Sequence, residues 1–297
     1  MQTTPKSAKI RPPAVAGQFY PGHPQRLRTE VADLLAKAAV PGDLRPKALI
    51  APHAGYIYSG RVAASAFATL RDHGKTIGRV VVIGPAHYVA VRGIAIPTCD
   101  AFATPLGQVP VDRDALAGIG DLPFMAHTDK PHAPEHALEV ELPFLEMVLG
   151  SFTLVPLVVG DAKPQEVAEV LQLLWGGGET LIVVSSDLSH YYDDAAARRL
   201  DAATAAMIEC GDWVSLGSDN ACGHLAIAGL LIECARHGLG ARRLALANSG
   251  DTAGSRDRVV GYGAWAWDAP GAEVYSSRSP SRPPPGKAAS LESDDAV

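Results

Sequence analysis

Three short apolar runs, each followed by a turn that carries a histidine, constrain the fold of this chain more than any other feature. In Leu181–Tyr191 four apolar residues give way at once to Ser-Ser-Asp-Leu-Ser-His-Tyr, and Ala48–His53 and Val80–His87 repeat the arrangement. Apolar runs of this length, bounded by polar residues, are typical of the central strands of an α/β sheet. Because open α/β sheets bind ligands beyond the carboxyl ends of their strands, we expect the three turns to share one site.

The rest of the chain alternates between helical and strand-like patterns. These patterns predict helices over 24–40, 60–73, 112–119, 137–149, 164–175, 193–210 and 222–237, and further strands over 93–97, 152–159, 244–247 and 259–267. Such alternation indicates a single α/β domain with a central mixed, largely parallel sheet flanked by helices. We expect the domain to span residues 10–268, after a flexible N-terminus (1–9) and before a disordered Ser/Pro-rich tail (269–297).

Composition excludes several classes of function. The chain has 297 residues, 47% of them hydrophobic, so it can bury a large core. The 26 basic and 32 acidic side chains give a net charge of −6, which argues against nucleic-acid binding. No window has eighteen uninterrupted apolar residues, which argues against a membrane span, and the N-terminus lacks the apolar core of a secretion signal. Four cysteines without Cys-x-x-Cys spacing indicate a reduced, cytoplasmic compartment.

The turns after the predicted strands carry the residue types of a transition-metal site. His53 and His87 follow consecutive strands, Asp187 and His190 follow a third, and Cys222 precedes a helix. Two imidazoles with one anionic ligand are typical of non-haem iron sites, whereas a thiolate shifts the preference toward copper or zinc. Simpler interpretations stay open: Asp187 also suits a helix N-cap, and Cys222 also suits a small buried hydrophobe.

A second motif, His132-Ala-Pro-Glu-His136, matches the inverted His-x-x-Glu-His pattern of zinc proteases. That chemistry needs a continuous helix, which Pro134 would interrupt. We therefore expect Glu135 near a helix N-terminus and His136 in the cleft formed by the strand ends. The chain has no phosphate-binding loop, no dinucleotide-binding glycine motif and no Gly-x-Ser-x-Gly elbow.

The order of these motifs along the chain resembles the Memo family, whose prokaryotic members are called AmmeMemoRadiSam system protein B. The resemblance covers about residues 10–268. It is carried by the stretches Arg11–Pro21, Ala51–Tyr56, Gly84–His87, Thr104–Gly107, Glu135–Phe144, Ser185–His190, Cys222–Gly223, Asn248–Asp251 and Val259–Tyr262.

The resemblance implies a fold like that of the class III extradiol dioxygenases, with a metal held by His53, His87 and Cys222 and with Asp187 and His190 lining the site. In those dioxygenases the third ligand is a carboxylate, whereas this chain offers Cys222 or Asp187. The prokaryotic family name also implies association with a radical-SAM protein and an AMMECR-type protein.

The first functional hypothesis is a cytoplasmic, metal-dependent redox protein, a dioxygenase-like oxidoreductase that uses iron or copper, with zinc as the alternative. Asp187 would be a fourth ligand or would orient one, and His190 would exchange a proton with bound substrate. A second hypothesis is a non-catalytic module that binds a small molecule or peptide in the same cleft, through Tyr56, Tyr88, Glu135 and His136. Hydrolysis at a zinc site is a third.

Overall fold

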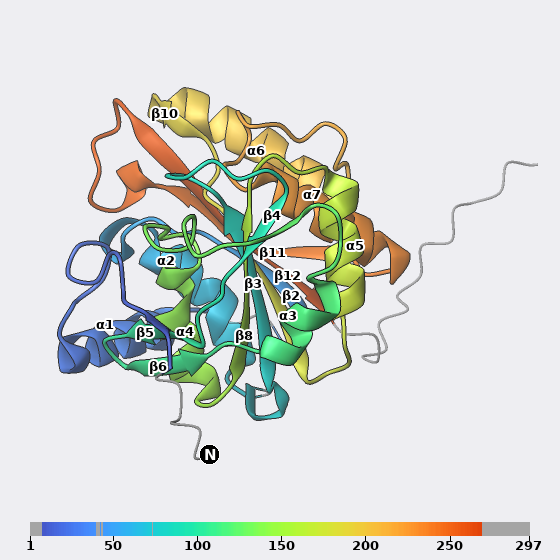
Figure 1. Cartoon of the computed structure of the whole chain (residues 1–297). Helices are drawn as coiled ribbons and strands as arrows, with labels where there is room; N and C mark the ends of the chain where they lie inside the picture. Colours follow the sequence, from blue (N-terminus) through green and yellow to red (C-terminus); the bar gives the residue numbers. More distant parts are fainter. Residues whose placement is uncertain (1–7, 40–41, 43, 73, 269–297) are drawn as a thin grey trace, which may run out of the picture.

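The computed structural model describes residues 8–39, 42, 44–72 and 74–268 (Figure 1). Most of the two predicted flexible ends, residues 1–7 and 269–297, lies outside this range. Lys9, which belongs to the predicted flexible N-terminus, donates its backbone N–H to Asp100 Oδ2 at 2.8 Å.

A nine-stranded mixed sheet forms the centre of the described residues, and the predicted α/β architecture is confirmed. Its order is β10-β12-β2-β9-β3-β8-β4-β7, and β11 pairs with β12. The central strands β2, β9, β3 and β8 are parallel, while β12 and β4 run antiparallel to their neighbours in this group. The bounds are β2 (Pro46–Ala51), β3 (Arg79–Pro85), β4 (Ile94–Ile96), β7 (Met125–His127), β8 (Thr153–Val159), β9 (Thr180–Ser185), β10 (His190–Tyr192), β11 (Ala241–Asn248) and β12 (Val259–Asp268).

Helices cover both faces of this sheet (Figure 1). On one side lie α1 (Pro24–Lys37), α2 (Tyr56–Phe67) and α4 (Leu142–Leu149), and on the other lie α3 (Arg113–Ile119), α5 (Pro164–Leu174), α6 (Asp194–Cys210) and α7 (His224–Arg236). α2, α3, α6 and α7 contact strands directly, while α1 and α4 pack on α2, and α5 packs on α7. Coverage on both sides explains why every residue of β2 and β9 is buried. In the described residues, no helix is long and apolar enough to cross a membrane.

Smaller elements complete the domain. A second sheet has the order β1-β5-β6, from β1 (Ile10–Arg11), β5 (Ala101–Thr104) and β6 (Gly107–Pro110). Single 3₁₀ turns occur at Ala68–Leu70, Gly74–Thr76, Glu139–Glu141 (η3) and Ser249–Asp251.

Two predicted helices have different bounds in the structure. The helix predicted over 60–73 begins earlier, at Tyr56, and ends at Phe67. The helix predicted over 137–149 is divided into η3 and α4. Pro143 has no backbone N–H to donate, so it is tolerated only in the first turn of α4. For this reason the regular helix does not continue from residue 142 toward residue 137.

Candidate metal centre

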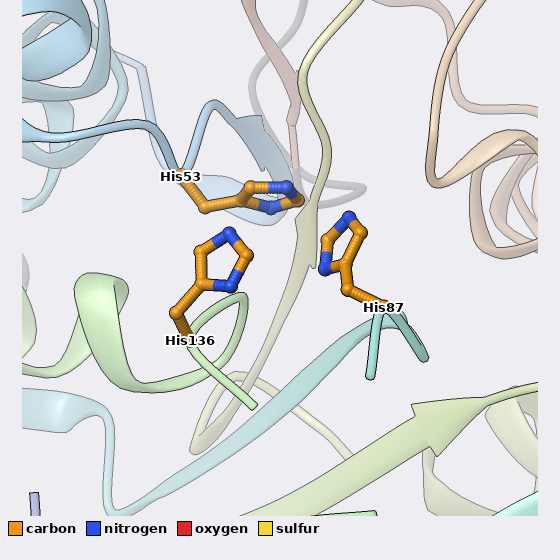
Figure 2. Close-up of side chains that lie close together, drawn as sticks. All are labelled: His53, His87 and His136. Carbon is orange, nitrogen blue, oxygen red and sulfur yellow. The ribbon is translucent and has the colours of Figure 1, made fainter. Parts of the chain in front are cut away.

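Three histidines from separate segments meet at the carboxyl ends of the parallel strands. His53 follows β2, His87 follows β3, and His136 lies in the loop that precedes η3. Each offers one ring nitrogen, and these three atoms all lie within 4.8 Å of one another. Figure 2 shows the three imidazoles grouped around a common centre. Their ring centroids are 4.7 to 5.2 Å apart. The group could hold a metal ion.

The outer nitrogens of two of these imidazoles are already occupied. His87 Nδ1 donates to Glu135 Oε1 at 2.8 Å, while the His87 backbone N–H donates to Glu135 Oε2 at 2.7 Å. His53 Nδ1 lies 2.8 Å from Ser185 Oγ. Metal-ligating histidines characteristically bond their second nitrogen in this way, which leaves Nε2 unprotonated for the ion.

His136 contributes through its other nitrogen. Among the described residues its buried Nδ1 has no hydrogen-bond partner, but it lies 3.4 Å from Glu135 Oε1, the same oxygen that His87 Nδ1 contacts. Because Nδ1 is on the side of this carboxylate, Nε2 is the nitrogen available to an ion. The three residues therefore fit a bound transition metal.

Burial keeps the His53 and His136 imidazoles neutral. It lowers the pKa of His53 well below its usual value, and the nearby His136 and His87 rings lower that pKa further. Burial also lowers the pKa of His136 to about 4. Because an imidazole binds metal only when neutral, both residues are ready to do so at neutral pH.

Cys222, the third ligand implied by the resemblance, lies beside His53. Its Sγ is 3.4 Å from His53 Nε2, and its backbone N–H donates to the Asp187 carbonyl at 3.2 Å. Burial, with Asp187 nearby, raises the pKa of the Cys222 thiol to about 12. The sulfur is therefore a thiol at neutral pH unless a cation stabilises the thiolate.

Asp187 and His190 both line the cavity in front of the histidines. Asp187 Oδ1 accepts the His53 backbone N–H at 2.9 Å, so this carboxyl holds the turn that carries His53. Burial raises the pKa of Asp187 to about 7. His190 Nδ1 must carry a proton, because it lies 2.8 Å from the Leu188 carbonyl, which can only accept; the ring therefore keeps Nε2 as a proton acceptor.

The cavity has a volume of about 720 Å³. It is lined by Gln18, Phe19, His53, Ala54, Gly55, Ile57, Tyr58, His87, Tyr88, His136, Asp187, His190, Tyr191, Ser249, Gly254, Ser255, Arg258, Val260 and Tyr262. Of the four residues expected in the cleft, Tyr88 and His136 are there. Tyr56 is not, because it begins α2 on its buried side and donates its hydroxyl to the Val140 carbonyl. Glu135 lies behind His87 and, with its His87 and backbone hydrogen bonds, does not reach the cavity.

Several lining residues were not expected from the sequence. Phe19 comes from the segment before α1, and Tyr262 comes from β12. Tyr191 has a φ of 66°, a strained value for a residue with a bulky side chain, and the Arg258 guanidinium lies 5.0 Å from its ring centroid. Phe19 and Tyr262 fall within the stretches that carry the family resemblance, and Tyr191 ends the Leu181–Tyr191 stretch whose turn was expected at the site. No such signal in the sequence pointed to Arg258.

The protease pattern has no matching geometry. Residues 131–138 form turns rather than a helix, and His132 Nε2 lies 3.1 Å from the Ala95 carbonyl, away from the three histidines. His132 and His136 therefore do not act as a pair.

Comparison with known proteins agrees with the sequence motifs. The family described as "Memo-like protein" matches residues 11–266. A MEMO1 family protein of Thermotoga neapolitana is 36% identical over 278 residues, and the match covers 85% of this chain and 98% of that protein. MEMO1 family proteins of Methanopyrus kandleri and Aquifex aeolicus are each 34% identical, covering 86% of this chain and 97% of their own. The chain belongs to the Memo family.

Proposed function

We propose that this protein is a metal-dependent redox protein, a dioxygenase-like oxidoreductase that uses iron or copper. The observation that carries the proposal is the group of three histidines, with the outer nitrogens of His53 and His87 held by Ser185 and Glu135. Imidazoles with an adjacent thiol suit iron, copper and zinc. A bound iron or copper ion would supply Lewis acidity and one-electron chemistry.

The residues of the chain have separate tasks in this proposal. His53 and His87 hold the ion, and either His136 or Cys222 completes the set. Asp187 fixes the His53 turn. His190 Nε2 accepts a proton from a hydroxyl group of the bound molecule, because its Nδ1 proton is committed to the Leu188 carbonyl. The aromatic rings of Phe19, Tyr88 and Tyr262 in the cavity wall suit a planar small molecule.

Metal analysis of protein purified without a nickel column tests the site. We expect His53→Ala to lose the metal, and a comparison of His136→Ala with Cys222→Ser to identify the third ligand. His127→Ala is the matched control, since His127 is exposed and lies 2.9 Å from the Gly120 carbonyl, apart from the three histidines. Unchanged metal content in His53→Ala, His136→Ala and Cys222→Ser would show that the site is elsewhere.

A dioxygen-uptake assay with a panel of catechols tests the activity. Steady uptake by the iron- or copper-loaded protein supports the oxidoreductase. Zinc as the sole native metal, with no uptake, would favour hydrolysis instead.

A second candidate, a non-catalytic binding module, is favoured by the rim of the cavity. Four large hydrophobic side chains of the cavity wall are exposed: Ile57 (66%), Tyr58 (38%), Tyr88 (55%) and Tyr191 (63%). Exposed apolar side chains gathered at a cavity favour docking of a peptide or small molecule. Turnover by the loaded protein would exclude a pure binder.

The prokaryotic name of the family supports a proposal about partners. We propose that the protein acts in the cytoplasm with a radical-SAM protein and an AMMECR-type protein. Recovery of both with a tagged chain from the native host, and not with an unrelated tagged control, is the expected result.

A further inference from the structure

A buried acid behind the metal centre has no charged partner among the described residues. Glu141, in η3, is fully buried. Its Oε1 lies 2.7 Å from Ser185 Oγ, the same hydroxyl that contacts His53 Nδ1. Its Oε2 has no hydrogen-bond partner in the part of the chain that the structure describes. Glu141 does not line the cavity, so it acts on the site only through Ser185.

The contacts of Ser185 determine where the protons lie. Three groups surround its Oγ: the Ala137 carbonyl at 2.6 Å, Glu141 Oε1 at 2.7 Å and His53 Nδ1 at 2.8 Å. A hydroxyl donates one hydrogen bond and accepts two. Because the Ala137 carbonyl can only accept, it takes the Ser185 proton. All three contacts are then hydrogen bonds only if both His53 Nδ1 and Glu141 Oε1 carry protons.

The surroundings of Glu141 agree with a neutral acid. An ionised carboxylate in this position would be buried with one hydrogen bond and no cation, which is strongly unfavourable. Burial, with Asp187 nearby, raises the pKa of Glu141 well above its usual value. Glu139, in the same turn, is different, because its carboxyl is paired with Arg11 at 2.6 Å.

We propose that Glu141 is a positioning residue: a permanently neutral carboxylic acid that donates to Ser185 Oγ and so fixes this oxygen as the acceptor of the His53 Nδ1 proton. His53 Nε2, which lies 3.4 Å from Cys222 Sγ, then carries the lone pair. The consequence of this role of Glu141 for metal binding rests on the proposed function. The protonation states of Glu141 and His53 do not depend on it.

Spectroscopy of the metal-free protein tests the protonation states at neutral pH. We expect nitrogen NMR of ¹⁵N-histidine-labelled protein to show His53 protonated at Nδ1, and an infrared difference spectrum of wild type against Glu141→Gln to show a protonated-acid carbonyl band. In Glu141→Gln the amide N–H replaces the acid O–H as donor, so His53 should keep its tautomer. In Ser185→Ala, which removes the acceptor, His53 should become a mixture of tautomers. In Glu141→Leu, Ser185 still donates to the Ala137 carbonyl, so His53 should keep its Nδ1 proton while the position of Ser185 Oγ becomes less fixed. A carboxylate band, or a proton on His53 Nε2 in the wild type, would overturn the proposal.

Metal affinity, measured by competition with a chelator, tests the consequence. Loss of such supporting groups lowers metal affinity about 10- to 100-fold, which we expect for Glu141→Leu but not for Glu141→Gln. Because Glu141 acts through Ser185, the double variant Glu141→Leu/Ser185→Ala should be no weaker than Ser185→Ala alone. Equal weakening by Gln and Leu would contradict the proposal.

Two controls separate the causes of failure. Glu169→Leu, an exposed position on α5, controls for the loss of an acid, and urea unfolding identifies variants that fail to fold. If Glu141→Leu does not fold, Ser185→Ala and Glu141→Gln decide the proposal through the His53 tautomer. If wild-type protein binds no metal, the proposed function fails, while the NMR and infrared results still decide the role of Glu141.

Discussion

Glu139 is the residue that attaches the N-terminal segment to the domain. Its carboxylate accepts hydrogen bonds from Arg11 Nη1 (2.6 Å), the backbone N–H groups of Ala14 (2.6 Å) and Val15 (3.0 Å), and the Tyr20 hydroxyl (2.5 Å). Every donor comes from residues 11–20, the segment that brings Phe19 into the cavity. The carboxylate therefore connects folding of this segment to the shape of the site.

Glu139→Gln should destabilise the fold by about 3–5 kcal/mol, because it leaves the buried Arg11 guanidinium without its anionic partner. Urea unfolding measures the effect, with exposed Glu169→Gln as the control. A loss smaller than about 1 kcal/mol, the value typical of surface pairs, would contradict this role for Glu139.

Individual site residues were predictable where they follow strands. His53 and His87 stand directly after buried apolar runs, so sequence placed them at one sheet edge. His136 was expected in the cleft but not among the ligands. Its position beside His53 and His87 depends on how the loop before η3 crosses the strand ends, and the path of a loop leaves no periodic pattern in the sequence. Tyr56 was misplaced because α2 begins four residues before the predicted boundary, which directs its ring inward.

At the scale of elements, the start of α7 lies unusually close to the end of β9. A Cβ on Gly223 would lie 2.7 Å from Ser186 Cβ and 3.0 Å from the Ser185 carbonyl oxygen. The Gly223 backbone N–H also donates to Ser186 Oγ at 2.9 Å. This close approach keeps the neighbouring Cys222 thiol beside His53.

Gly223→Ala should therefore move α7 away from β9 and withdraw the thiol. We expect a stability loss of about 1–3 kcal/mol from overpacking, together with weaker metal binding if Cys222 is a ligand. Chelator competition and urea unfolding measure the two effects. Gly217→Ala is the matched control, because a Cβ there would meet only Asn220 Oδ1, at 3.9 Å; equal behaviour of the two variants would refute the close-packing argument.

The residues that join the N-terminal strand to the domain should make stability depend on acid pH. Asp129 pairs with Lys9 and accepts the Thr98 backbone N–H at 2.7 Å. Partial burial raises the pKa of Asp129, but hydrogen bonds from Lys9 and Thr98 outweigh it and lower the pKa from 3.8 to about 2. A folded-state pKa below the unfolded value means that this contribution is complete above about pH 4 and is lost as the pH falls toward 2.

We expect Asp129→Asn to be less stable than wild type by about 1 kcal/mol or less at pH 5–7, and the two proteins to converge near pH 2. Urea unfolding at several pH values measures the difference. If the difference in unfolding free energy between wild type and Asp129→Asn is the same at pH 2 as at pH 7, the carboxylate charge of Asp129 does not cause it.

The central strands were predicted to within about two residues, because their runs of buried β-branched residues are distinctive. Two short strands, β7 and β10, were not predicted, although β4 (Ile94–Ile96) was. β7 (Met125–His127) and β10 (His190–Tyr192) have three residues each, too few for a periodic pattern, and exist because they pair with β4 and β12. Their positions depend on contacts between distant parts of the chain.

For the whole molecule, a metal bound only by the folded state must stabilise it. Free metal at a thousand times its dissociation constant adds about 4 kcal/mol. We expect thermal unfolding to shift upward with the native ion and to return to its metal-free value with chelator, and the His53→Ala variant to show no shift. Identical unfolding with and without iron, copper and zinc would exclude a metal site that forms on folding.

The place of β12 in the sheet has a consequence for how the chain is made. It is the last strand of the described residues, yet it lies inside the sheet, between β2 on one edge and β10 and β11 on the other. During synthesis on the ribosome, all elements from β1 to β11 emerge before β12, so β2 has an unpaired edge during that time. An unpaired strand edge can pair with the wrong strand or with another chain. We expect the nascent polypeptide to depend on chaperones until Val259–Asp268 has left the ribosome, and the cavity, which needs Val260 and Tyr262, to be completed last.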